Sequence, residues 1–511
     1  MGELDVRRRH QPGEGHHLAA VTRLRGDEHP AREPKSLRLE TERMRVTGGE
    51  CVLDASECGP AASRRGVEEC LHLVEDRAQI GVHGGGHPTA IIQFQPRRGM
   101  GRAAHLSAGR DPSFFAVLVA LVLVLALALA PAAFGSPLTK RLASALAVPH
   151  VDHSRSAAVA LDLRTGKVVF SRNPTLALLP ASNEKLPVAY AALKELGPRF
   201  RFSTEALANG ELDGTTWRGD VVLKGFGDPS LTIADLDDLA LQVRDSGITH
   251  VAGAVLGDES YFDPLRTAPG WKASFYIEES PPLSALVAER GKYRGRTPRN
   301  PALAAASLFR QALERAGVTV AKRTRAGTAG AEALPMALHL SRPLRELVRF
   351  MGRESDNFTA EMLVKSLGAQ ATGVGSTAAG VAAMRSSLAT AGVPLAGVRL
   401  ADGSGLSSLD RLTAASLVRL LAIAYSDPVV REPFIASLAV AGVNGTLEDR
   451  LESAPARSRV VAKTGTTAAS SALSGFVRDR YAFAIVHNGR PVSLWWARSA
   501  QDRFATALAS Q

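Results

Sequence analysis

The alternation of apolar runs and turn residues in this chain becomes clear from residue 157 onward. Residues 158–163 and 167–170 are largely apolar and strand-like in pattern, and Arg164-Thr165-Gly166 separates them. Glycine adopts the positive φ of a tight turn at low cost. The pattern therefore predicts a β-hairpin over residues 158–170.

A helical pattern follows this hairpin. Tyr190, Leu193 and Leu196 recur at three-residue intervals, and Gly197-Pro198 ends the pattern. We therefore expect a helix that begins near Ser182 and ends before Gly197. Because proline removes one backbone donor, we expect Pro187 to kink this helix just after its first turn.

Residues 201–335 have a different pattern, with short apolar runs at 219–223 and 251–256 that predict strands. Between these runs, Gly225-Phe226-Gly227-Asp228-Pro229 resembles the opening of a dinucleotide-binding fingerprint. The spacing of that fingerprint fails and its third glycine does not follow, so we interpret the stretch as a structural turn.

Helices and strands both appear in the remainder of the chain. The pattern predicts helices at 344–351, 360–367, 412–424 and 500–509, and strands at 459–463, 473–477 and 481–486. The glycine-rich stretch 402–407 precedes one of these helices, and we expect its serines to serve as turn and cap groups.

The amino-terminal part reads differently from the rest. Residues 1–99 show little periodicity, and we interpret them as a disordered or spurious extension rather than a His-rich metal-binding tail. Arg102 and Arg110 then precede an apolar run of 17 residues, 114–130, and small residues follow at 131–136. This order is typical of a secretory signal peptide. We expect residues 100–135 to be a signal cleaved near residue 135, or a retained membrane anchor at 114–130, and the protein to be exported to the cell envelope, periplasmic or extracellular.

Composition narrows the classes of partner. The chain has 511 residues and a net charge of +11, which favours anionic surroundings. No Lys/Arg block is interleaved with aromatic residues, so nucleic acid is not an expected partner. The only cysteines are Cys51, Cys58 and Cys70, and they lack the paired spacing of a zinc site. No cofactor or metal is implied.

The candidate chemistry begins with Ser182 and Lys185. Residues three apart on a helix share a face, so the hydroxyl and the amine can meet. Serine needs an adjacent base to become a nucleophile, and a lysine with a lowered pKa can supply it. Ser355-Asp356-Asn357 and Lys463-Thr464-Gly465 follow in the order found in serine-type penicillin-binding proteins and class A β-lactamases.

When further sequence stretches are added to these motifs, the chain resembles the D-alanyl-D-alanine carboxypeptidase/endopeptidase family, the low-molecular-mass class C penicillin-binding proteins. The carrying stretches, besides these motifs, are Pro180-Ala181-Ser182-Asn183-Glu184-Lys185-Leu186, Gly225-Phe226-Gly227-Asp228-Pro229, Gly257-Asp258-Glu259-Ser260-Tyr261-Phe262, Ala360-Glu361-Met362-Leu363, Asp402-Gly403-Ser404-Gly405-Leu406-Ser407 and Lys463-Thr464-Gly465-Thr466. The long separation between Ser182 and Ser355 is similar to that in this family, whose members insert extra domains between the two motifs.

The resemblance implies a fold and a domain organisation. The expected class is α/β (α+β), a transpeptidase-like fold with an antiparallel sheet flanked by helices. Residues 136–200 and 336–511 would form a discontinuous serine DD-peptidase domain, and residues 201–335 a mostly-β inserted region.

The resemblance also implies roles for individual residues. Ser182 would attack the carbonyl between two D-alanines of a peptidoglycan stem peptide, and Lys185 would take its proton. Ser355 would relay a proton to the leaving amine, and Asn357 would hold the substrate amide or Lys185. Lys463 would bind the terminal carboxylate electrostatically, helped by the hydroxyls of Thr464 and Thr466, and Gly465 would leave room for the substrate. The backbone donors of Ser182 and Thr466 would form an oxyanion hole, and β-lactams would acylate Ser182 as covalent inhibitors.

Alternatives remain on the same scaffold. A β-lactamase, an esterase or a non-catalytic cell-wall-binding protein would carry the same motifs, although a Glu-x-x-Leu-Asn stretch typical of class A β-lactamases is missing from the sequence. We expect Asp356 to be structural, and Glu184, which would point away from Lys185 on a helix, to be solvated. The preference between carboxypeptidase and endopeptidase action stays open.

Overall fold

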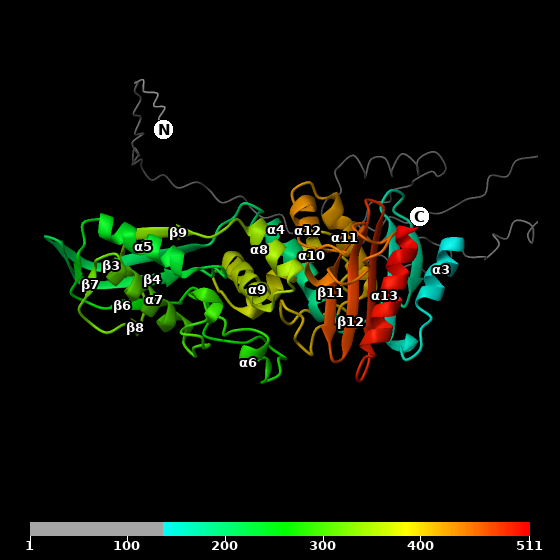
Figure 1. Ribbon diagram of the computed structural model, residues 1–511, viewed down its shortest axis with the longest axis horizontal. Coiled ribbons are helices and arrows are strands. Elements are labelled where there is room, and N and C mark those ends of the chain that lie inside the picture. Colours follow the sequence, from blue (N-terminus) through cyan, green and yellow to red (C-terminus); the bar gives the residue numbers. More distant parts are fainter. Residues whose placement is uncertain (1–135) are drawn as a thin grey trace, which may run out of the picture. The chain divides into compact units, whose positions relative to one another are not determined.

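The computed structural model describes residues 136–511, and strands from both ends of this part of the chain form an antiparallel sheet (Figure 1). The six strands run in the order β10-β11-β12-β13-β1-β2. Strands from both ends of this part of the chain therefore pair, with Ala160 of β1 opposite Phe483 of β13. The strands of this sheet are β1 (Ser156–Asp162), β2 (Val168–Arg172), β10 (Ala439–Val440), β11 (Val460–Thr467), β12 (Ser470–Val477) and β13 (Tyr481–Asn488).

The predicted hairpin is confirmed as the pair β1 and β2. The strands are antiparallel and Gly166 in the turn has a φ of +69°. The two expected strands near the carboxy terminus are also confirmed, as β12 and β13. Every residue of β12 is buried, because helices cover both faces of the sheet.

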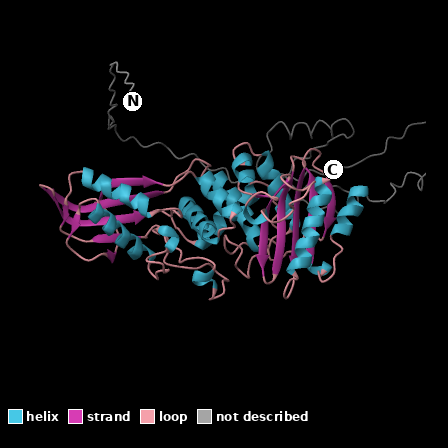
Figure 2. Ribbon diagram, in the orientation of Figure 1, coloured by secondary structure: helices cyan, strands magenta, loops and turns pink. Residues whose placement is uncertain are grey.

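Helices lie on both sides of this sheet (Figure 2), and an apolar layer forms on each of its faces. Because successive side chains of a strand point to opposite faces, Ala157 and Val159 pack on one side while Ala158 and Ala160 pack on the other. The first layer includes α4, α8, α9, α10 and α11, and the second includes α3 and α13. The helices around this sheet are α3 (Pro137–Ala145), α4 (Lys185–Glu195), α8 (Leu344–Arg353), α9 (Asn357–Thr372), α10 (Thr377–Thr390), α11 (Ala414–Ser426), α12 (Arg431–Ala436) and α13 (Leu494–Ala509).

A second, seven-stranded sheet is built from residues 203–340, which we call the 203–340 segment. The long strands β3 and β4 form an antiparallel hairpin, and β9 pairs with β3. Helices α5 and α7 pack on one face around Phe309 and Leu236. The elements of this segment are β3 (Ser203–Asp213), β4 (Thr216–Gly225), α5 (Ile233–Asp245), β5 (His250–Val251), β6 (Val255–Asp258), α6 (Phe275–Glu278), α7 (Pro301–Arg315), β7 (Thr319–Val320), β8 (Arg325–Ala326) and β9 (Leu334–Leu340).

These elements confirm the predicted fold class, a mixed protein with an antiparallel sheet flanked by helices. The stretch at Gly225–Pro229 is a turn as interpreted, since Gly227 has a φ of +93° and the Asp228 carboxylate accepts from the Ser230 N–H at 2.8 Å. The carboxy-terminal helix begins at Leu494, earlier than the apolar pattern indicated.

The expected kink at Pro187 is wrong, because it assumed that the helix begins near Ser182. The α-helix α4 begins only at Lys185, after a 3₁₀ turn over Ala181–Glu184, so Pro187 lies in the first turn of α4. The first backbone N–H groups of an α-helix have no partner within the helix, and proline is therefore tolerated there.

The expectations for residues 1–99 and for the apolar run at 114–130 lie outside the described residues. Among the helices of residues 136–511, none has the length and apolar character that crossing a membrane requires.

Candidate active site

Ser182 lies in the 3₁₀ turn Ala181–Glu184, where the chain leaves the region of the sheet and enters α4. Two glycines let other segments approach this turn closely. A Cβ on Gly405 would lie 1.9 Å from the carbonyl oxygen of Ala181, and one on Gly465 would lie 2.8 Å from that of Pro180. The glycine in the Lys-Thr-Gly motif is thus required by the turn that carries Ser182, in addition to any room it leaves for a substrate.

The Lys185 side chain is buried and points its amine at three acceptors. Its Nζ donates to Ser182 Oγ at 3.1 Å, to Asn357 Oδ1 at 2.8 Å and to the Ser404 carbonyl oxygen at 2.6 Å. Burial lowers the pKa of Lys185 to about 8, against the opposing effect of nearby carboxylates. A lysine with this pKa is a competent base near neutral pH.

The Ser355-Asp356-Asn357 motif forms the turn before α9. Ser355 has a φ of +59°, a conformation that costs a non-glycine residue about 1 kcal/mol or more. Asp356 is the N-cap of α9, because its Oδ1 accepts from the Thr359 N–H at 2.7 Å. This structural role of Asp356 agrees with the expectation, and it places Asn357 at the start of the helix, facing Lys185.

Lys463 lies on β11, opposite the helical elements, and its amine is also buried. Its Nζ donates to Ser355 Oγ at 2.8 Å and to the carbonyl oxygen of Thr464 at 2.9 Å. Burial, followed by the positive charge of Lys185, lowers the pKa of Lys463 well below its ordinary value. Asn183 Nδ2 donates to the Lys463 carbonyl oxygen at 3.1 Å, so the nucleophile turn and β11 are joined directly.

The hydroxyls of Thr464 and Thr466 lie on the other face of β11. Thr464 Oγ1 is 2.8 Å from Thr446 Oγ1, and Arg498 of α13 donates from Nη2 to Thr466 Oγ1 at 3.4 Å. Strand β10 pairs with β11 only at Val461 and Ala462, so the outer edge of β11 beyond residue 462 has no β10 partner. Direct contacts thus join Ser182, Lys185 and Asn357, join Ser355 to Lys463, and place Gly465 against the nucleophile turn. Thr464 and Thr466 lie on the opposite face of the same strand.

Glu184 is a correction to the sequence interpretation. It was expected to be solvated, but it is fully buried and neither carboxyl oxygen has a hydrogen-bond partner among the described residues. The loop at Gly405 covers it, since a Cβ on that glycine would lie 3.1 Å from the Glu184 Cβ. Burial, together with the charges of Asp402 and Glu361, raises the pKa of Glu184 well above its usual range.

Glu361 lies in one of the stretches that carry the resemblance, but no role was expected for it. Its Oε1 accepts from the N–H groups of Gly403 and Ser404 at 3.0 and 2.8 Å, which holds the loop whose Ser404 carbonyl contacts Lys185. Burial, then the charge of Asp402, raises the pKa of Glu361 to about 8. The serines of this loop act as turn groups as expected, but its contact with Lys185 uses a backbone oxygen that carries no sequence signal.

The 203–340 segment also reaches the motif residues. The carbonyl oxygen of Glu279 accepts from Asn357 Nδ2 at 3.1 Å, and Arg290 forms an ion pair with Asp356. Trp271 Nε1 donates to Asp402 Oδ2 at 2.8 Å. The Ser355-Asp356-Asn357 motif and the loop at Asp402 therefore both have partners from the second sheet's segment, which no motif pattern indicated.

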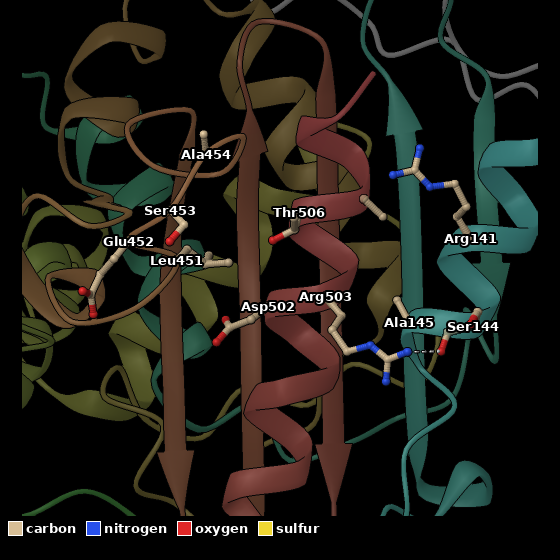
Figure 3. Close-up of a pocket in the computed structure, with 11 residues that line it drawn as sticks. Arg141, Ser144, Ala145, Leu451, Glu452, Ser453, Ala454, Asp502, Arg503 and Thr506 are labelled. Carbon is tan, nitrogen blue, oxygen red and sulfur yellow. Dashed lines mark hydrogen bonds between the residues drawn. The ribbon is translucent and has the colours of Figure 1, made fainter.

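A separate hollow of about 620 Å³ lies between α3, α13 and the loop at 451–454 (Figure 3). Arg503 on its wall donates to the carbonyl oxygen of Ser144 at 3.2 Å. None of the eight motif residues lines this hollow, so it is not part of the candidate active site.

A family profile and two curated relatives match most of the described part of this chain. The profile of the D-Ala-D-Ala carboxypeptidase 3 (S13) family matches residues 138–299 and 291–511. A D-alanyl-D-alanine carboxypeptidase of Actinomadura sp. (strain R39) is 33% identical over 448 residues, which cover 71% of this chain and 82% of that protein. A carboxypeptidase of Mycobacterium tuberculosis is 33% identical over 422 residues, 77% of this chain and 87% of that protein.

A solved structure agrees on the fold. Penicillin-binding protein 4 of Haemophilus influenzae matches with a TM-score of 0.64 at 22% identity, over 74% of this chain and 98% of that chain. The same protein complexed with a β-lactam matches with a TM-score of 0.60.

Proposed function

Because the chain belongs to the D-Ala-D-Ala carboxypeptidase 3 (S13) family, we propose that it is a penicillin-sensitive serine D-Ala-D-Ala carboxypeptidase that acts through an acyl-enzyme on Ser182. One observation carries the assignment of the nucleophile. The amine of Lys185 is buried, lies 3.1 Å from Ser182 Oγ and is held by Asn357 Oδ1 on its other side. A serine hydroxyl with such a base beside it is activated for attack on a carbonyl.

In the first step, Ser182 Oγ attacks the carbonyl carbon of the penultimate D-Ala while neutral Lys185 takes the hydroxyl proton. The backbone N–H groups of Ser182 and Thr466 would stabilise the oxyanion, a contribution usually worth several kcal/mol of barrier. Collapse of the tetrahedral intermediate breaks the peptide bond. The nitrogen of the terminal D-Ala takes the proton that Lys185 received, relayed through Ser355, and free D-alanine departs, which leaves Lys185 neutral again.

In the second step, water attacks the carbonyl carbon of the Ser182 ester while Lys185 takes its proton. The C–Oγ bond then breaks, and Ser182 Oγ takes that proton back from Lys185. The products are the shortened stem peptide and free D-alanine, and the enzyme returns to its starting state. Lys463 supports the relay, because its amine lies 2.8 Å from Ser355 Oγ. A β-lactam would enter the same first step and remain on Ser182 with slow release.

Binding of the substrate backbone would use the open edge of β11. Beyond Ala462 this edge has no pairing with β10, so an extended peptide can add to it as a further strand. The hydroxyls of Thr464 and Thr466 would contact the terminal carboxylate.

The test is release of D-alanine from a pentapeptide ending in D-Ala-D-Ala, compared with turnover of a chromogenic cephalosporin. We expect D-alanine release by the wild-type protein, its loss in Ser182→Ala, and little cephalosporin turnover. Rapid turnover of the cephalosporin without D-alanine release would favour a β-lactamase, and inactivity toward both would favour a non-catalytic wall-binding protein.

We also infer that the protein works outside the cytoplasm, on peptidoglycan stem peptides. The support is the sequence order of basic residues, apolar run and small residues between Arg102 and Ser136. Intact-mass analysis of the natural protein tests this inference. A mature amino terminus near residue 135 is expected for a cleaved signal, and retention of 114–130 would indicate an anchor.

A further inference from the structure

The terminal carboxylate of a D-Ala-D-Ala peptide needs a cationic or hydrogen-bonding partner at the mouth of the site. Neither motif lysine is exposed, since both are 1% accessible to solvent. The three donors of the Lys185 amine are directed at Ser182, Asn357 and Ser404. Lys463 turns its amine inward to Ser355. A carboxylate that stays at the surface therefore lacks a direct contact with these two amines.

The face of β11 that carries Thr464 and Thr466 lies beside a third basic residue, Arg498, in addition to Lys185 and Lys463. Side chains alternate along the strand, and Val460 and Ala462 on this face belong to the apolar layer that also contains residues of α13. Thr464 and Thr466 continue the same face toward the end of the strand, where the first turns of α13 begin. Arg498 stands at this point, exposed, with its Nη2 at 3.4 Å from Thr466 Oγ1.

Arg498 has the chemistry that this position requires. Among the described residues it makes no ion pair within 4.0 Å, so its guanidinium charge is not neutralised by a carboxylate of residues 136–511. Guanidinium groups bind carboxylates with two parallel hydrogen bonds and remain charged at all working pH values. The Thr466 hydroxyl beside it can supply a further donor to the same group.

We propose that Arg498, together with the Thr466 hydroxyl, binds the free C-terminal carboxylate of the peptide substrate and thereby makes Arg498 a specificity-determining residue for carboxypeptidase over endopeptidase cleavage. An internal peptide bond, which offers an uncharged amide at this position, gains nothing from the guanidinium. The inference rests on the proposed function, because it places the leaving D-alanine against β11.

The experiment compares two tripeptides that end in D-Ala-D-Ala, one with a free carboxylate and one with a C-terminal carboxamide. We expect Arg498→Gln to lower kcat/KM for the carboxylate peptide about 10- to 100-fold, as for loss of a charge-assisted pair, and to leave the carboxamide peptide within about twofold. Arg498→Lys should retain part of the preference. Arg503→Gln is the matched control on the same helix, because Arg503 lies on the hollow of Figure 3, and should leave both values unchanged.

A second measurement does not depend on peptide turnover. The rate of Ser182 acylation by benzylpenicillin is compared with that by its methyl ester, which lacks the carboxylate charge. We expect Arg498→Gln to reduce the ratio of the two rates by the same factor. Equal effects on both members of either pair, or none, would overturn the role of Arg498 while penicillin labelling of Ser182 persists. A wild-type protein that neither releases D-alanine nor is labelled would instead overturn the proposed function, and this inference with it.

Discussion

The guanidinium of Arg290 forms an ion pair with the carboxylate of Asp356, which joins the 203–340 segment to the second catalytic motif. The same guanidinium lies over the rings of Phe350 and Phe358, with its carbon 5.0 and 5.6 Å from the ring centroids. Asp356 in turn caps α9 and precedes Asn357, the partner of Lys185. The second sheet's segment thus contributes to the geometry of the active site, in addition to its own core.

Arg290→Met should slow acylation of Ser182 by benzylpenicillin about fivefold, because a partly exposed ion pair contributes about 1 kcal/mol and here it orients the motif turn. Arg299→Met, at an exposed position in the same loop, is the control and should have no effect. Asp356→Asn should produce a similar loss, and the double variant should be no worse than either single one. Additive losses would show that the two side chains act independently.

Gly405 should tolerate no side chain. An alanine there would have a φ of +82° and a Cβ 1.9 Å from the Ala181 carbonyl oxygen, which displaces the turn that carries Ser182. We expect Gly405→Ala to cost about 2–4 kcal/mol in the free energy of unfolding and to abolish most penicillin labelling. Gly373→Ala is the matched control, with a φ of +74° and open space around its Cβ, and should cost only about 1 kcal/mol in urea unfolding. Equal costs for the two variants would contradict the close packing of Gly405 against the Ala181 carbonyl oxygen.

Acylation should depend on pH through Lys185. Its pKa, lowered to about 8 by burial, means that the neutral amine needed as a base becomes more abundant as pH rises. The acylation rate should therefore increase about tenfold per pH unit below pH 8 and level off above it. Rates measured with benzylpenicillin between pH 6 and 9 test this expectation, and a flat profile would argue against Lys185 as the base.

Glu361 offers a way to separate charge from hydrogen bonding. Because burial raises its pKa to about 8, this carboxyl is largely protonated at pH 7 and Glu361→Gln should change penicillin acylation by less than about threefold. Glu361→Leu removes the acceptor for the Gly403 and Ser404 N–H groups and should slow acylation at least about tenfold. Similar rates in the two variants would mean that Glu361 does not support the loop.

The same carboxyl has a stability signature. A carboxyl whose folded pKa lies above its unfolded value binds more protons in the folded state, so its contribution to stability falls as pH rises from about 4.5 toward 8. Glu361→Gln should therefore be more stable than the wild type at pH 8 and should lose this part of the pH dependence. Thermal unfolding from pH 5 to 8 measures it, and the persistence of the acylation profile in Glu361→Gln assigns that profile to Lys185.

The motif residues could be predicted from the sequence because each motif consists of a few residues at short, fixed spacing. Ser182 and Lys185 are three residues apart, and the hairpin around Gly166 follows from local turn preferences. The fold class followed from the resemblance that these motifs carry. The partners that hold the motifs could not be predicted in this way, because they come from distant parts of the chain.

The Ser404 carbonyl is the clearest example of such a partner. It contacts Lys185 through a backbone oxygen that every residue possesses, so only the three-dimensional course of the loop identifies it. For Glu184, the sequence predicted a solvated side chain, but the side chain is buried. A helical projection placed it away from Lys185 and toward solvent, but the loop at Gly405 packs on that side and buries it.

The measurement that tests the central proposal most directly is mass spectrometry of the protein after treatment with benzylpenicillin. If Ser182, Lys185, Ser355 and Lys463 form one acylating pocket, a single adduct should appear, peptide mapping should place it on Ser182, and Ser182→Ala should abolish it. An adduct on another residue, or an unlabelled wild-type protein that is correctly folded, would contradict the account.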